Sequence, residues 1–280
     1  MDKPVEQKII GDYRINVYYS FYPSNPCEDW DLAGNFYWMN ERHMSGHARR
    51  DYGNSRKTTT DVLQELVAKY VDSKTLFEMF KKGVGDRKDG NSDYLLQYDR
   101  SAHAWYMMSF VFGKYYRHDC FEWTKDELVK HGIISEYVEL IDDEDDLISL
   151  LDSHANDIAI DTWSSTGYCQ GDYIEGICYM TKEQFDELCF SHKYEDWRDD
   201  AKECMEGEAE AIGRWAWNDV YGYTLEKKVP KDVTGTSVDD DHQDEEEYQE
   251  IDSCWDFFMD PEDVIKEVIA DHKELSALVA

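Results

Sequence analysis

Carboxylates are the side chains whose type and spacing stand out in this sequence. They form three segments, and we take all of their members as candidate partner-binding residues: Asp142, Asp143, Glu144, Asp145 and Asp146; Glu195, Asp199, Glu203, Glu206 and Glu210; and Asp239, Asp240, Asp241, Asp244, Glu245, Glu246, Glu247 and Glu250. Ionised carboxylates accept hydrogen bonds and attract ammonium and guanidinium groups. The chemistry that they indicate is the binding of a cationic partner.

The second segment has the spacing of a helix. Its members lie four, four, three and four residues apart, which places them on one helical face. Successive carboxylates would then lie about 4.5–6 Å apart along the helix axis. One strand of duplex DNA carries a phosphate every ~3.4 Å of axis. Such a face could therefore stand in for alternate phosphates.

The first and third segments also have simpler explanations. Residues 142–146 directly precede the apolar stripe that begins at Leu147, and acidic residues at the start of a helix are stabilised by its dipole. Five acidic residues in succession nevertheless exceed what capping requires. Residues 239–247 do not match the D-x-D-x-D-G spacing of a calcium loop. We therefore expect neither a metal ion nor a cofactor.

An enzymatic alternative depends on His43 and His47. These histidines stand four residues apart and could face one metal ion on a helix, with Asp31 or Glu41 adding an oxygen ligand. However, Gly46 lies between them and the H-E-x-x-H order is missing. The sequence also lacks G-x-S-x-G and any standard glycine-rich phosphate loop. We expect that the chain is not an enzyme, and a metal-dependent hydrolase remains the open alternative.

The negative charge of the chain is unevenly distributed. Its 280 residues include 62 acidic and 29 basic side chains, for a formal net charge of −33. Residues 1–123 hold 18 of the acids and 17 of the bases, so residues 124–280 hold the other 44 acids and 12 bases. A surface of this charge disfavours nucleic acid and anionic membranes as direct partners, and favours rapid, salt-sensitive association with basic proteins. A homodimer is compatible with this interpretation.

The cysteines and the N-terminus indicate a cytoplasmic location. The seven cysteines are odd in number and never form C-x-x-C, which fits reduced thiols better than disulfides or a zinc site. No apolar run is long enough for a signal peptide or a membrane span. We expect the protein to work in the cytoplasm.

The chain contains both strand and helix patterns, and we predict an α+β fold of antiparallel sheets with packed helices. Strands are predicted over residues 8–20, 104–116, 157–162, 173–180 and 220–226, the last of these forming a hairpin with 251–258. We divide the chain into a near-neutral N-terminal α+β part, 1–123, and an acidic C-terminal α+β part, 124–280. The two parts could share one sheet.

Helices are predicted from apolar stripes and from capping residues. The features used are the stripe Val62, Leu63, Leu66, Val67, Tyr70 and Val71; Ser73 as the cap of a helix with Leu76, Phe77 and Phe80; the capping boxes Thr124 with Glu127 and Thr181 with Gln184; and Asp260 with Pro261 before Val264, Ile265, Val268, Ile269 and Leu275.

Three short patches carry a resemblance to known sequences. They are Asn25-Pro26 with Trp30-Asp31, Gly34, His43 and Gly46; Gly171-Asp172 with Gly176-Ile177-Cys178-Tyr179; and Asp219-Val220-Tyr221-Gly222-Tyr223 with Asp252-Ser253-Cys254-Trp255. In these patches the chain resembles an uncharacterised family of acidic proteins carried by phages and mobile elements. The resemblance implies a mobile-element origin and a strand-rich α+β fold, and it implies no known activity. By charge, the chain is also similar to DNA-mimic anti-restriction and anti-CRISPR proteins.

Charge, spacing and resemblance together favour one functional hypothesis. The chain would be a non-catalytic phage counter-defence inhibitor, working in the host bacterial cell, whose acidic surface mimics DNA. It would thereby block a basic nucleic-acid-binding defence protein, such as a CRISPR effector or a restriction enzyme. Two alternatives stay open: the hydrolase based on His43 and His47, and a phage structural or assembly protein.

Overall fold

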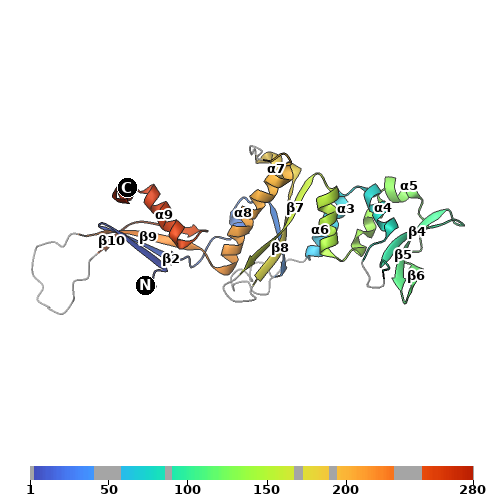
Figure 1. Cartoon of the computed structure of the whole chain (residues 1–280), viewed down its shortest axis with the longest axis horizontal. Coiled ribbons are helices and arrows are strands. Elements are labelled where there is room, and N and C mark those ends of the chain that lie inside the picture. Colours follow the sequence, from blue (N-terminus) through green and yellow to red (C-terminus); the bar gives the residue numbers. More distant parts are fainter. Residues whose placement is uncertain are drawn as a thin grey trace, which may run out of the picture. The chain divides into compact units, whose positions relative to one another are not determined.

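The structure is a computed structural model that describes residues 3–40, 58–85, 90–166, 173–188, 194–229 and 248–279 (Figure 1). Helices and antiparallel sheets occur together, so the expected α+β fold with packed helices is confirmed. The described residues form two compact units. Of the described residues, those up to Asp31 and from Glu210 onwards belong to the terminal unit, and those between Leu32 and Ala209 belong to the central unit. These limits differ from the division at residue 123 that the charge distribution suggested.

A four-stranded antiparallel sheet forms the basis of the terminal unit. Its order is β1 (Glu6–Ile10), β2 (Tyr13–Tyr19), β9 (Tyr221–Lys228) and β10 (Tyr248–Phe257). Ile15 of β2 lies opposite Leu225 of β9, so strands from the two ends of the sequence pair directly. The expectation that the N-terminal and C-terminal parts share one sheet is therefore confirmed, as is the hairpin of β9 with β10.

Helices cover one face of this sheet. Figure 1 shows α9 (Pro261–Asp271, red) against β2 and β9, and α10 (Lys273–Val279) follows it. Ile15, Val17 and Leu225 form a buried core with Val264 and Val268. Pro261 takes the first position of α9 as expected, whereas Leu275, predicted for the same helix, belongs to α10. The short helix α1 (Pro26–Asp29) completes the described elements that lie wholly in this unit.

The central unit contains two three-stranded antiparallel sheets. One has the order β3 (Asn35–Asn40), β8 (Tyr173–Thr181) and β7 (Ile158–Thr166), and the other β4 (Tyr94–Asp99), β5 (Ala104–Val111) and β6 (Lys114–Arg117). The helices of this unit are α3 (Thr59–Tyr70), α4 (Ser73–Lys82), α5 (Lys125–Lys130), the 3-10 helix η1 (Ile133–Leu140), α6 (Glu144–His154) and α7 (Lys182–Glu187). The helix α8 (Trp197–Trp217) begins in the central unit and continues into the terminal unit beyond Ala209.

Local signals located the helices of the central unit well. Val62, Leu63, Leu66, Val67 and Val71 of the predicted stripe are buried, whereas Tyr70 is only half-buried. Both capping boxes are present. The cap of α4 is Asp72 rather than Ser73, because the Asp72 carboxylate accepts hydrogen bonds from the N–H groups of Lys74 and Thr75. The apolar side chains of α3, α4, η1 and α6 share one core with Met107, Ile158 and Ile177 of the sheets.

Two of the predicted strands are in fact hairpins. Residues 8–20 divide into β1 and β2 at a turn where Gly11 has a φ of +59°. Residues 104–116 divide into β5 and β6 at Phe112 and Gly113, with φ values of +48° and +81°. A bulky residue rarely adopts positive φ. Phe112 therefore gives no sequence signal of a turn, and the sequence predicts residues 104–116 as one strand.

Tryptophan rings lie against glycines on two central strands. Trp163 of β7 lies directly opposite Gly176 of β8, and a Cβ added to Gly176 would lie 2.4 Å from the indole nitrogen. In the other unit, a Cβ added to Gly222 of β9 would lie 2.0 Å from Cε3 of Trp255. Contacts this close require glycine, because no other residue leaves the space above the strand empty.

Candidate functional site

A row of carboxylates along α8 is the candidate functional site. Asp199, Glu203, Glu206 and Glu210 are all exposed, and at 100° per residue they fall within an arc of roughly 60°. We call these four residues the acidic row. The prediction that they share one helical face is confirmed. Glu195, predicted for the same helix, is exposed but precedes the first residue of α8, Trp197.

The opposite face of α8 attaches the helix to the central unit. Ala201 and Met205 are fully buried there. The Glu208 carboxylate accepts hydrogen bonds from the backbone N–H groups of Ala33, at 2.6 Å, and Gly34, at 3.0 Å. Gly34 leaves space for Met205, whose Cγ would lie 2.8 Å from a Cβ at that position. Burial and hydrogen bonds thus fix this face of α8, while the side chains of the acidic row on the other face are exposed.

The protonation of Glu208 should affect stability. Burial raises the pKa of its carboxyl above the usual value, and the two backbone hydrogen bonds oppose this rise. A raised pKa in the fold means that folding favours the protonated acid. The stabilisation of the fold by protonated Glu208 is therefore complete below the pKa of about 4.3 that glutamate has in the unfolded chain. It is lost as pH rises through the pKa of Glu208 in the folded protein.

Glu208→Gln should therefore remove part of the dependence of stability on pH. We expect the free energy of unfolding of wild type minus that of Glu208→Gln to fall as pH rises from 4 to 7, measured by urea unfolding at each pH. Glu206→Gln, on the exposed face of α8, is the control for loss of one negative charge. A wild-type minus Glu208→Gln difference that stays constant over this range would contradict the assignment.

A hollow of about 800 Å³ opens beside the start of α8. It is lined by Lys182, Tyr194, Glu195, Asp196, Trp197 and Asp199, and so includes two of the predicted partner-binding residues. The Asp196 carboxylate binds the guanidinium of Arg198 at 2.7 Å, and this hydrogen bond lowers the pKa of Asp196. The Asp200 carboxylate accepts the backbone N–H of Tyr194 at 3.2 Å, which holds Tyr194 next to the helix.

The first acidic segment has a partly structural role. The Asp143 side chain caps α6 by accepting the N–H groups of Asp145 and Asp146, at 3.0 and 3.2 Å. Glu144 accepts a hydrogen bond from the hydroxyl of Thr60 at 2.8 Å. Asp142, Asp143, Asp145 and Asp146 are nevertheless all exposed.

Cations of α8 contact α6 at its other end. Lys202 lies 2.8 Å from the Asp152 carboxylate, and Arg198 donates to the Asp152 carbonyl at 3.1 Å. Asp152 is nine residues beyond Asp143, or about 14 Å along the helix axis. The first acidic segment and the acidic row are therefore not one continuous row.

Most of the third segment lies outside the described residues, as do His43, His47 and Glu41. Glu250 is described: it is exposed on β10 of the terminal unit, opposite Glu226 in the strand register. Asp31 is also exposed. Within the described ranges, no group of three or more His, Cys, Asp or Glu side chains could hold a metal ion.

Arg214 joins three carboxylates, a cluster that sequence reasoning missed. Its guanidinium lies 3.2 Å from Glu210, 3.6 Å from Asp219 and 3.1 Å from Asp260, and the arginine side chain is only 17% exposed. The spacing of four between Glu210 and Arg214 could have indicated one of these pairs. The chain thus already binds a guanidinium with three carboxylates: one from α8 itself, one from the segment between α8 and β9, and one from the residue that precedes α9.

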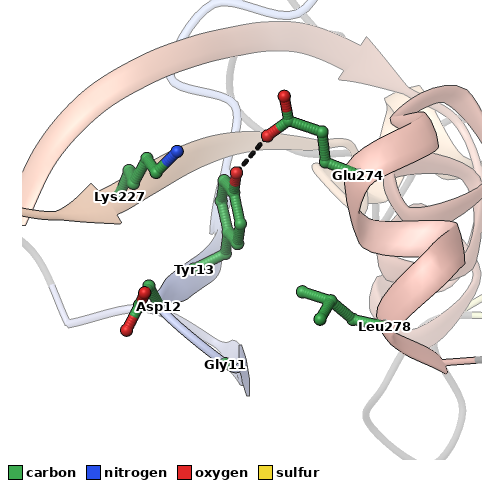
Figure 2. A pocket seen from close by; sticks show the side chains of 6 residues that line it. All are labelled: Gly11, Asp12, Tyr13, Lys227, Glu274 and Leu278. Atoms are coloured by element: carbon green, nitrogen blue, oxygen red, sulfur yellow. Dashed lines mark hydrogen bonds between the residues drawn. The ribbon is translucent and has the colours of Figure 1, made fainter.

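A second hollow, of about 360 Å³, lies in the terminal unit between the turn at Gly11 and α10 (Figure 2). The Tyr13 hydroxyl donates to Glu274, and the Lys227 ammonium lies 5.0 Å from the centre of the Tyr13 ring. Tyr13 raises the pKa of Lys227 by hydrogen bonding. Because Glu274 belongs to α10 and Tyr13 to β2, this cluster attaches the last helix to the sheet.

Comparison with known protein families, with curated proteins and with solved structures finds no match for this chain. In the part of the chain that the structure describes, no helix is both long and apolar enough to cross a membrane.

Proposed function

We propose that this protein is a non-catalytic, DNA-mimicking inhibitor that binds a basic nucleic-acid-binding protein through the acidic row. The main support is that Asp199, Glu203, Glu206 and Glu210 are exposed on one face of α8. On the opposite face, Glu208 fixes the helix through its hydrogen bonds to the backbone of Ala33 and Gly34. A groove built for nucleic acid presents lysine and arginine at the spacing of phosphates. Regularly spaced carboxylates on a fixed helix are suited to occupy such a groove.

The rigidity of the helix matters for this proposal. Fixing long side chains and backbone on binding costs free energy, and a surface that is already ordered avoids much of that cost. The hydrogen bonds of Glu208 and the burial of Ala201 and Met205 supply this order. Electrostatic attraction between surfaces of opposite charge then raises the rate of association and makes the affinity depend on salt.

The class of target follows from the same charge argument and from the resemblance to phage and mobile-element proteins. We propose a host defence protein in the bacterial cytoplasm, a CRISPR effector or a restriction enzyme, whose DNA channel is basic. Capture from bacterial lysate at low salt, followed by elution at rising salt and mass spectrometry, would identify it. The captured protein should then lose duplex DNA binding as this chain is added, whether or not EDTA is present. Inhibition that EDTA abolishes would instead support a metal-dependent hydrolase.

Neutralising the acidic row should weaken the complex. We expect Glu203→Gln with Glu206→Gln to lower affinity for the captured protein about tenfold to a hundredfold at 50 mM salt, because two charge pairs are lost. The slope of log affinity against log salt should become shallower by about two. Fluorescence anisotropy at several salt concentrations measures both quantities.

A matched control separates position from net charge. Glu262→Gln with Glu267→Gln removes two exposed carboxylates from α9 in the terminal unit, so the change in net charge is identical. We expect this variant to bind as wild type does. Equal losses in the two variants would mean that only total charge matters, and the acidic row would not be the binding site.

A further inference from the structure

We propose that the hollow beside the start of α8 binds an arginine side chain of the partner, with the guanidinium lying over Trp197 and Tyr194 and pairing with Glu195 and Asp199. This inference rests on the proposed function and names the group that the site would recognise. The hollow is an open depression in the surface with a volume of about 800 Å³, so a partner side chain could enter it directly from solvent. It combines two aromatic side chains with carboxylates, which is the chemistry that recognises a planar cation.

Trp197 already has a cation near its ring. The Lys182 ammonium lies 5.5 Å from the centre of the Trp197 ring and 5.9 Å from that of Phe185, which itself lies 5.4 Å from Trp197. A positive charge within about 6 Å of a ring centre is attracted by the negative face of the π system. The Trp197 ring thus already attracts a cation of this chain, and Tyr194, with 42% of its surface exposed, lines the same hollow.

The neighbouring cations pair with other carboxylates. Lys182 pairs with Asp186, Arg198 with Asp196 and Lys202 with Asp152. Glu195 and Asp199 line the same hollow and belong to none of these three ion pairs, and Asp199 interacts electrostatically with Arg198. A guanidinium entering from outside would find two carboxylates to accept its hydrogen bonds, with Trp197 and Tyr194 in the same lining for stacking.

Arginine is favoured over lysine for a geometric reason. A guanidinium is planar, stacks on aromatic rings and donates along a fixed fork, whereas an ammonium is a compact and strongly hydrated charge. Glu203, Glu206 and Glu210 of the acidic row do not line this hollow, so they offer a guanidinium no ring on which to stack. Selectivity for arginine is therefore the property that separates the hollow from the row.

The test compares nona-arginine and nona-lysine peptides, titrated calorimetrically into the full chain at 50 and 150 mM salt. Wild type is expected to bind nona-arginine about fivefold more tightly than nona-lysine. Tyr194→Ala and Trp197→Leu should each reduce this ratio to about one while leaving the affinity for nona-lysine unchanged. Circular dichroism and thermal unfolding check the fold, and the exposed Tyr194 provides the decisive variant if Trp197→Leu does not fold.

The same titrations distinguish this inference from the proposed function. Glu203→Gln with Glu206→Gln should weaken both peptides equally and keep the arginine preference. Equal affinity of wild type for the two peptides, or an arginine preference that survives Tyr194→Ala, would overturn the arginine site and leave the acidic row standing. An arginine preference lost in Tyr194→Ala, together with no effect of the row variant on either peptide, would support the arginine site and overturn the row.

Discussion

Arg214→Met is expected to lower the free energy of unfolding by about 2–4 kcal/mol. The substitution removes the guanidinium that lies within 3.6 Å of Glu210, Asp219 and Asp260, and leaves these three carboxylates to repel one another. Removing one partner of a buried pair costs about 3–5 kcal/mol. The expected value is lower because Glu210 and Asp260 are 68% and 66% exposed and therefore screened by solvent.

Urea unfolding at low and high salt measures this loss and its cause. We expect sodium chloride to recover part of the stability of Arg214→Met, because salt screens the repulsion among the three carboxylates. Arg214→Lys keeps the positive charge but loses the planar, forked arrangement of N–H donors. Its free energy of unfolding should therefore lie between those of wild type and Arg214→Met. Lys130→Met breaks an exposed pair with Asp126 and should cost less than about 0.5 kcal/mol. A loss in Arg214→Met as small as that in Lys130→Met would contradict the role of this cluster.

Gly222→Ala is expected to destabilise the terminal unit by about 1–3 kcal/mol, the usual cost of overpacking. The new methyl group would lie 2.0 Å from Cε3 of Trp255, so the indole ring or the strand must move. Gly222 lies on β9, between β2 and β10 in the sheet, which limits how far the backbone can shift. Urea unfolding gives the change in free energy.

The matched control for Gly222 is a glycine with free space around it. Gly207 of α8 has no atom within 4 Å of an added Cβ, so Gly207→Ala should stabilise the chain by about 1 kcal/mol through helix propensity. Trp255→Ala supplies a second control, because the cost of Gly222→Ala should largely disappear once the ring is absent. A cost that persists in the double variant would show that Trp255 is not the cause.

The two proposals have different requirements of the structure. The acidic row needs only regular spacing on an ordered helix, and it should respond to salt and to the number of carboxylates. The hollow needs a shape, because stacking on Trp197 and Tyr194 works only if both rings keep their positions. The backbone contact of Tyr194 with Asp200 and the packing of Trp197 on Phe185 supply those positions.

The sequence by itself determined the features whose causes lie within one helical turn. Thr124 with Glu127 and Thr181 with Gln184 are three residues apart, so their capping hydrogen bonds could be predicted from spacing alone. The same holds for the buried stripe of α3 and for the acidic row, because both follow from the 3.6-residue period. Glu195 was misassigned because spacing cannot show where a helix begins.

Only the tertiary structure decided the contacts between residues that are distant in the chain. Glu208 and Ala33 are 175 residues apart, and nothing local to either residue indicates their hydrogen bond. The turn at Phe112, the ring over Gly222 and the walls of the hollow are likewise set by which strands and helices meet. A local pattern specifies which face of a helix or strand is apolar. Which other helix or strand packs against that face depends on the favourable and unfavourable contacts of the whole unit.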